Sequence, residues 1–335
     1  MKNSEQKISP LKKFIYALEF IPLALLIGFF YALPPETASR IAGKLGRKYG
    51  PKFAKSRKAI THLKMALPGK TDEEYKTIVA GMWDNLARIF AEYPGLSHFA
   101  PRVDLVGIEY LKSAFDEYGQ VILFSGHIGN WEVMAPTLLE YGIELDLVYR
   151  APNNPWADKV LDYFRSMDGK LVTIPKSKAG TRLLVERMRE NKSIGILIDQ
   201  KYNEGIAAPF FGHPAMTSPA FVQLGQKFDC PVIPFRVERV EDTHFRLSFF
   251  EPMRLFDEEG VSRPAETLIA EAHTLLEGWI RERPDQWLWL HRRWINVKNP
   301  GKKAAAKMQT AGQKKPAQKA KTSPRPSQGP QKPAS

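Results

Sequence analysis

The sequence predicts an α/β fold with a mainly parallel central sheet flanked by helices, preceded by an N-terminal membrane helix and a helical N-terminal segment. Beyond Asp104, short apolar runs recur with amphipathic segments of helical length between most of them, and this alternation is typical of parallel sheets. With 335 residues, 43% hydrophobic and 25% charged, the chain can bury a large core. The predicted strands are Val121–Phe124, Leu145–Tyr149, Leu171–Ile174, Ile194–Ile198 and Val232–Val237.

The first element is an apolar stretch, Phe14–Leu33, of a length that spans a bilayer as a helix. It contains Glu19 and Pro22, and no small-residue cleavage site follows, so a removable signal peptide is not expected. The stronger basic cluster follows the stretch, which favours a protein body on the cytoplasmic side. Because both flanks are basic, a helix lying in the inner leaflet is an alternative, and a buried core helix is a third.

Residues from Ala38 to Phe99 are expected to be helical, with Thr71 as an N-cap and apolar residues at helical spacing after it. Near the other end of the sheet, His244–Phe250 is expected to add an antiparallel strand and Ala265–Arg281 a closing helix. The predicted organisation is therefore an anchor at residues 1–37, a catalytic domain at 38–299 and a tail at 300–335.

The tail explains most of the net charge of +13, because it holds about nine basic residues and no acidic one. Its composition predicts disorder. Contact with anionic lipid head groups is one hypothesis for it, and a solvated tail without function is another. Nucleic acid is not an expected partner, because the tail has no aromatic residue for stacking on bases. The single cysteine, Cys230, excludes an intramolecular disulfide and is expected to pack as a small apolar residue.

The segment His127-Ile128-Gly129-Asn130-Trp131-Glu132 follows the first predicted strand and is the strongest functional signal. On a regular helix, His127 and Glu132 would point about 140° apart. A strand-to-helix turn, in which Gly126 and Gly129 permit unusual backbone angles, would let them meet. We therefore expect His127 to act as a general base and Glu132 to orient its imidazole, at the sheet edge where α/β folds bind ligands.

This box resembles the His-x4-Glu motif of the bacterial lipid A late acyltransferases, the lauroyl and myristoyl transferase family. The resemblance continues in order through Val148–Pro155, Ile198-Asp199-Gln200, Pro209–Thr217 and Gln286–Trp294. It covers about residues 14–297. One segment departs from the family pattern: Thr61-His62-Leu63 and Leu67-Pro68 stand where many members carry Arg-Asn-Leu and Phe-Pro.

The resemblance implies an enzyme on the cytoplasmic face of the inner membrane that moves a fatty acyl chain from acyl carrier protein to a hydroxyl of a Kdo-bearing lipid A precursor. It implies that His127 and Glu132 are catalytic, and that Arg150, Asp199, Gln200 and Asn130 bind substrate or brace the catalytic pair. No cofactor and no metal are expected. A surface salt bridge is the alternative for Arg150, and helix capping the alternative for Asp199.

Several other functions remain alternatives or are disfavoured. The acceptor could be another polar membrane lipid, such as a mannosylated phosphatidylinositol, and a non-enzymatic membrane scaffold is a rival of a different class. A serine hydrolase would need Gly-x-Ser-x-Gly, which the sequence lacks. A zinc hydrolase motif is also missing. Trp287, Trp289 and Trp294 are expected either as interfacial anchors or as core packing around the sheet.

Overall fold

Seven strands form one mainly parallel sheet in the computed structural model, which describes residues 9–167 and 169–294. The strand order is β1-β9-β8-β2-β5-β3-β4, and every neighbouring pair is parallel except β8 and β9. The strands are β1 (Val103–Val106), β2 (Ile122–Ser125), β3 (Leu145–Tyr149), β4 (Thr173–Pro175), β5 (Ser193–Leu197), β8 (Val232–Glu241) and β9 (His244–Phe249). A separate antiparallel hairpin joins β6 (Ile206–Phe210) to β7 (His213–Thr217).

The predicted fold class is confirmed, because each of the five expected apolar runs contributes a strand and β9 is antiparallel to β8 as expected. Two features were not predicted. Strand β1 is a four-residue edge strand whose side chains alternate between half-buried and exposed, so it has no continuous apolar run. The β6–β7 hairpin carries Pro209 and Pro214 at paired positions, and proline is a poor strand former.

Ten α-helices surround the sheet within the described residues. They are α1 (Pro10–Tyr31), α2 (Pro35–Tyr49), α3 (Ala54–Ala66), α4 (Asp72–Glu92), α5 (Ile108–Tyr118), α6 (Met134–Glu140), α7 (Pro155–Arg165), α8 (Lys178–Arg189), α9 (Ala220–Phe228) and α10 (Ala265–Glu282). Short 3-10 helices lie at η1 (Gly50–Lys52), η2 (Tyr93–Arg102), η3 (Trp131–Val133) and η4 (Pro284–Gln286). Thr71 caps α4 as expected, and it forms a reciprocal capping box with Glu74.

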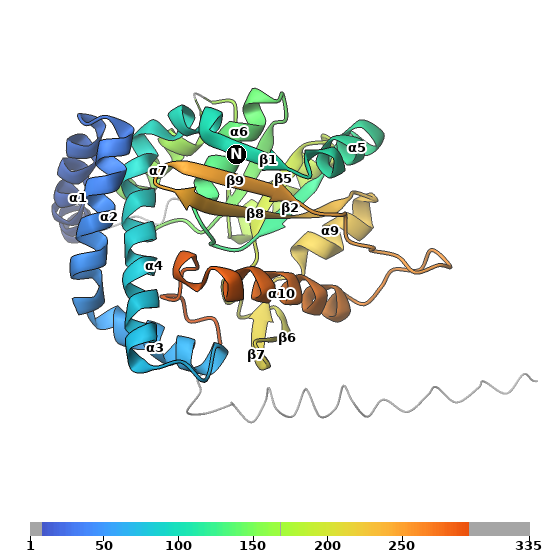
Figure 1. The fold of residues 1–335 in the computed structure, drawn as a ribbon. Helices are drawn as coiled ribbons and strands as arrows, with labels where there is room; N and C mark the ends of the chain where they lie inside the picture. The colour runs from blue at the N-terminus through green and yellow to red at the C-terminus, as the bar shows by residue number, and fades with distance from the viewer. Residues whose placement is uncertain (1–8, 168, 295–335) are drawn as a thin grey trace, which may run out of the picture. The chain divides into compact units, whose positions relative to one another are not determined.

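The sheet divides the core into two layers, since alternate residues of each strand face opposite sides. On β2, Ile122 and Phe124 belong to the cluster that includes α3, α4, α8, α9 and α10, whereas Leu123 belongs to the cluster that includes α5, α6 and η2. Figure 1 shows α5 and α6 on one side of the sheet and α9 and α10 on the other. Strand β2 is thus buried on both faces.

The three C-terminal tryptophans belong to this core. Trp287, Trp289 and Trp294 are all buried and pack against Phe210 or Phe211 of the hairpin region. Core packing is therefore correct for them, and the interfacial reading is wrong. Cys230 is also buried, as expected, and its burial raises the pKa of its thiol to about 12.

Helix α1 is 22 residues long and contains an 18-residue window with a mean hydropathy of 2.0, so its length and composition would let it cross a membrane. Only 6% of its apolar window is buried, which disfavours the core-helix alternative. It contacts α7: the Asn154 amide donates to the Tyr16 carbonyl at 2.9 Å, and the rings of Phe20 and Trp156 stack at 6.2 Å. The domain boundaries stay predictions, and the tail after residue 299 lies outside the described residues.

Candidate active site

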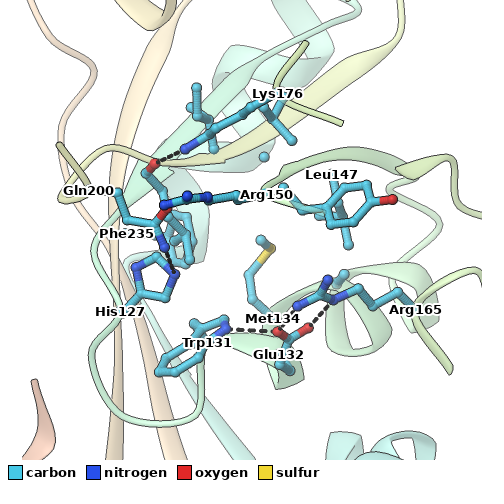
Figure 2. A pocket seen from close by; sticks show the side chains of 16 residues that line it. His127, Trp131, Glu132, Met134, Leu147, Arg150, Arg165, Lys176, Gln200 and Phe235 are labelled. Atoms are coloured by element: carbon cyan, nitrogen blue, oxygen red, sulfur yellow. Dashed lines mark hydrogen bonds and ion pairs between the residues drawn. The ribbon is translucent and has the colours of Figure 1, made fainter. Parts of the chain in front are cut away.

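The candidate residues gather at the carboxyl ends of four neighbouring strands. The sheet order β2-β5-β3-β4 places His127 after β2, Asp199 and Gln200 after β5, Arg150 after β3 and Lys176 after β4. Because all four strands are parallel, their carboxyl ends lie at one edge of the sheet. Figure 2 shows Arg150, Gln200 and His127 pointing into one pocket, with Lys176 at its far side.

Asp199 holds His127 through two hydrogen bonds. Its Oδ1 lies 2.7 Å from the imidazole Nδ1, and its Oδ2 accepts from the His127 backbone N–H at 2.8 Å. The Oδ2 atom also accepts from the indole N–H of Trp287 at 2.8 Å. Burial alone would raise the pKa of Asp199, but the charge and hydrogen bonds of His127 outweigh it and lower that pKa well below its usual value. An ionised Asp199 only accepts, so His127 carries its proton on Nδ1 and presents a bare Nε2 to the pocket.

Two glycines make this arrangement possible, although only one does so as expected. Gly129 has φ +61°, and a side chain there would meet the carbonyl oxygen of Val237 at 2.3 Å. Gly126 does not adopt a positive φ. Its contribution is space, since a Cβ there would lie 3.2 Å from Oδ2 of Asp199. The aspartate can therefore approach the backbone before His127.

Glu132 does not contact His127 in the way the spacing predicted. Its carboxylate accepts from Arg165 Nε at 2.9 Å and Nη2 at 2.5 Å, from the Tyr93 hydroxyl at 2.5 Å and from Trp131 Nε1 at 2.7 Å. Burial opposes ionisation, but the Arg165 cation outweighs it and lowers the pKa of Glu132. Asp199, and not Glu132, is therefore the carboxylate that contacts Nδ1 of His127 and can orient the imidazole. The carboxylate of Glu132 is hydrogen-bonded to Arg165, Tyr93 and Trp131.

Gln200 lies on the pocket side of the imidazole, and its substrate-binding role stays a prediction. Its Nε2 is 3.2 Å from His127 Nε2 and 3.3 Å from His291 Nε2. Burial, followed by the charge of His127, lowers the pKa of His291 to about 4, so His291 is neutral at pH 7. One amide group can therefore donate to two bare imidazole nitrogens at once.

Asn130 has a structural place instead of the expected substrate contact. Its side chain is fully buried, donates to Glu92 at 2.6 Å and accepts from the Glu132 backbone N–H at 3.1 Å, which caps η3. His62, in the segment that departs from the family pattern, also avoids the pocket, and its Nδ1 lies 3.1 Å from the Trp289 carbonyl.

The pocket in front of His127 has a volume of about 110 Å³ and combines an apolar floor with three cations. The cations are Arg150, Arg165 and Lys176, and Glu132 is the one carboxylate among the lining residues. The apolar floor is formed by Met134, Ala135, Leu147, Val148, Ile196 and Phe235. Such a pocket suits an acyl chain or amphipathic arm that bears a negative group.

Several features of the site were not predicted: the presence of Tyr93, Arg165, Lys176 and His291, and the donor role of Trp287. Arg165 ends α7, some 33 positions from the carboxylate it binds, and no local motif marks it. The signal for Trp287 was present in the Gln286–Trp294 segment, which pairs with the histidine box through a bridge between Ile128 and Trp287.

Comparison with known proteins assigns the family. The family model of the bacterial lipid A biosynthesis acyltransferases matches residues 5–296. The chain belongs to this family. The acyltransferase is 24% identical over 278 residues to the lipid A biosynthesis lauroyltransferase of Escherichia coli (strain K12), across 78% of this chain and 86% of that protein.

A solved structure gives a looser likeness. The crystal structure of the 1-acyl-sn-glycerophosphate (LPA) acyltransferase, PlsC, from Thermotoga maritima is 14% identical and covers 82% of the acyltransferase and 99% of its own chain, with a TM-score of 0.35.

Proposed function

We propose that this acyltransferase moves a fatty acyl chain from the thioester of acyl carrier protein to a hydroxyl of a Kdo-bearing lipid A precursor, at the cytoplasmic face of the bacterial inner membrane. The observation that carries the proposal is the buried Asp199 carboxylate holding His127 at the mouth of a partly apolar pocket. The family, and the name of the E. coli relative as a lipid A biosynthesis lauroyltransferase, support the lipid class.

His127 is the general base in the proposed step. Its Nε2 takes the proton of the acceptor hydroxyl as the oxygen attacks the thioester carbonyl, forming a C–O bond and a tetrahedral intermediate. Collapse of the intermediate breaks the C–S bond, and the imidazolium returns the proton to the leaving thiolate. Asp199 stabilises the imidazolium between these two transfers, because its carboxylate lies 2.7 Å from Nδ1.

Two further residues have proposed roles around this step. The Gln200 amide lies 3.2 Å from His127 Nε2, so it is placed to donate to the oxyanion once substrate displaces it from the imidazole. Glu132 remains in the proposed catalytic machinery, but through Arg165. The buried ion pair fixes η3 and the end of α7, and both line the pocket.

Helix α1 and the basic surface support the proposed partners. A glycolipid with several acyl chains stays in the bilayer, since each exposed methylene costs about 0.8 kcal/mol, so the enzyme has to work at the membrane. Acyl carrier protein is acidic, and the basic residues that follow α1 suit its attraction.

Product analysis tests the proposal. Purified protein is incubated with lauroyl-acyl carrier protein and a Kdo-bearing lipid A precursor in mixed micelles, and the lipid is analysed by mass spectrometry. We expect one added acyl chain with the wild type and none with His127→Ala. Transfer to a mannosylated phosphatidylinositol in place of the precursor would overturn the acceptor assignment, and equal transfer by His127→Ala would overturn the mechanism.

A further inference from the structure

We infer that Arg150 and Lys176 form a phosphate-binding subsite of the active-site pocket. This inference rests on the proposed function and deepens it by assigning a charged group of the substrate to a place in the structure. The two cations follow β3 and β4, which are separated by β5 from β2, the strand that precedes His127.

The backbone brings the two cations together. The Lys176 backbone N–H donates to the Tyr149 carbonyl at 2.8 Å, so Lys176 is bonded to the residue immediately before Arg150. The Lys176 ammonium reaches across to β5 and donates to the Leu197 carbonyl at 3.1 Å. This contact directs the ammonium toward the pocket, which both cations line and which Figure 2 shows.

Neither cation is ion-paired with a carboxylate in the part of the chain that the structure describes. Arg165 lines the same pocket but is paired with Glu132. The Lys176 side chain is exposed overall, yet desolvation of its ammonium, together with the Arg150 charge, lowers its pKa, and the Asp199 charge opposes this. A bound anion would stabilise the charged ammonium and raise the pKa of Lys176 again.

The start of α8 adds to the positive potential. Lys176 directly precedes Ser177, whose hydroxyl accepts from the Gly180 N–H at 3.0 Å and caps this 12-residue helix. The positive end of the helix dipole therefore lies beside the two cations. A forked guanidinium, an ammonium and a helix start are the groups that bind phosphate oxygens.

The two cations lie close to the base. The Lys176 ammonium contacts Leu197 at the end of β5, the strand next to β2, and neighbouring strands lie about 4.8 Å apart. A phosphate on either substrate is a candidate for the subsite: the phosphodiester of the carrier protein's pantetheine arm, or a phosphate on the glycolipid. The chemistry recognised is the same, and kinetics separates the two sources.

Binding of inorganic pyrophosphate tests the subsite without relying on catalysis. Calorimetry on the full-length protein in nonionic detergent compares the wild type with Lys176→Gln, Lys176→Arg and Lys227→Gln. Lys227 is an exposed lysine at the end of α9, near the start of β8. We expect Lys176→Gln to weaken pyrophosphate binding about tenfold, Lys176→Arg to restore most of it and Lys227→Gln to leave it unchanged. Equal binding by Lys176→Gln, or no binding by the wild type, overturns the subsite.

Paired substrates then identify the source of the phosphate. Acyl-phosphopantetheine is compared with acyl-pantetheine as donor, and the phosphorylated glycolipid with its dephosphorylated form as acceptor. In one of the two pairs, Lys176→Gln should raise KM about tenfold for the phosphorylated member alone. An equal rise for both members of each pair would assign Lys176 to packing and overturn the inference. A wild type that transfers nothing in any pair refutes the proposed function, and the pyrophosphate result still decides the subsite.

Discussion

Glu132 is the residue whose sequence motif and structural contacts differ most. Its carboxylate accepts hydrogen bonds from Tyr93, Trp131 and Arg165, and the carboxylate and guanidinium are both largely buried. A buried carboxylate is stable as an anion only when such partners compensate for lost hydration. Each of the two buried charges, the Glu132 carboxylate and the Arg165 guanidinium, is therefore stabilised by the other.

Removing one member of this pair should cost stability. We expect Arg165→Met to lower the free energy of unfolding by about 3–5 kcal/mol, because it leaves a buried charge unpaired. Adding Glu132→Gln to that variant should recover part of the loss. Urea unfolding followed by circular dichroism in detergent measures both effects. The control is Arg47→Met, whose ion pair with Asp84 is half-exposed and should be worth under about 1 kcal/mol. A loss no larger than the control's would contradict the role given to the pair.

Much of the candidate site was predictable because its residues follow strands. His127, Arg150, Asp199 and Gln200 all stand just after apolar runs, and parallel strands bring their carboxyl ends to one edge. The pairing of side chains was not predictable from spacing. Asp199 meets His127 because β5 lies next to β2 in the sheet. No local sequence pattern shows that these two strands are neighbours.

At the scale of elements, α10 joins the hairpin to the C-terminal segment through one buried histidine. His273 Nδ1 lies 2.6 Å from the Pro209 carbonyl of β6, while its Nε2 lies 2.9 Å from the Thr217 hydroxyl and 2.8 Å from Arg293. The carbonyl accepts, so Nδ1 carries the proton and the ring is neutral. Burial, followed by the Arg293 charge, lowers the pKa of His273 to about 3.

This histidine should make stability depend on pH. Its folded pKa of about 3 lies below the unfolded value of 6.5, so only the unfolded chain binds its proton between these values. The contribution is therefore complete above pH 6.5 and is lost as the pH falls, by up to about 1.4 kcal/mol per pH unit.

Urea unfolding at pH 7, 6 and 5 measures this dependence. We expect the free energy of unfolding of His273→Gln to fall less steeply than that of the wild type over this range. His213→Gln, on the half-exposed start of β7, is the control. Parallel curves for the wild type and His273→Gln would contradict this, because they would show that His273 is already a charged imidazolium in the folded state.

The elements were predictable to the extent that apolar runs and caps marked them. The central strands, α4 with its Thr71 cap and α10 have such signals. The β6–β7 hairpin does not, because its prolines and alanines acquire strand geometry from packing against α10 and the tryptophans. Tertiary contacts overrode local propensity there.

At the scale of the whole molecule, the proposed membrane helix α1 contacts α7, whose last residue lines the pocket. Its apolar residues are mostly exposed, and its contacts to Asn154 and Trp156 lie at the beginning of the helix that ends in Arg165. An anchor that also positions α7 would influence catalysis as well as location.

Replacing α1 separates these two effects. We expect deletion of residues 1–33 to release the protein from vesicles and to reduce transfer to a bilayer acceptor at least tenfold, since acceptor and enzyme no longer share a surface. An unrelated apolar helix in place of α1 should restore vesicle binding, measured by sedimentation, but only part of the rate. A truncated protein with full activity toward the bilayer acceptor would refute the anchor.

The most direct test of Asp199 as the residue that orients the base is the tautomer of His127, measured by NMR with 15N-labelled histidine and assigned with His127→Gln. In the wild type we expect Nδ1 protonated and Nε2 bare. Oδ2 of Asp199 accepts from two N–H groups, whereas Oδ1 faces only Nδ1 of His127. In Asp199→Asn, the amide oxygen should therefore take the place of Oδ2 and the NH2 group should face Nδ1. Because an NH2 group donates, Nδ1 should then be bare and Nε2 protonated, whereas Glu132→Gln should leave the tautomer unchanged. A reversal in Glu132→Gln, with none in Asp199→Asn, would contradict the assignment of Asp199 as the residue that orients the base.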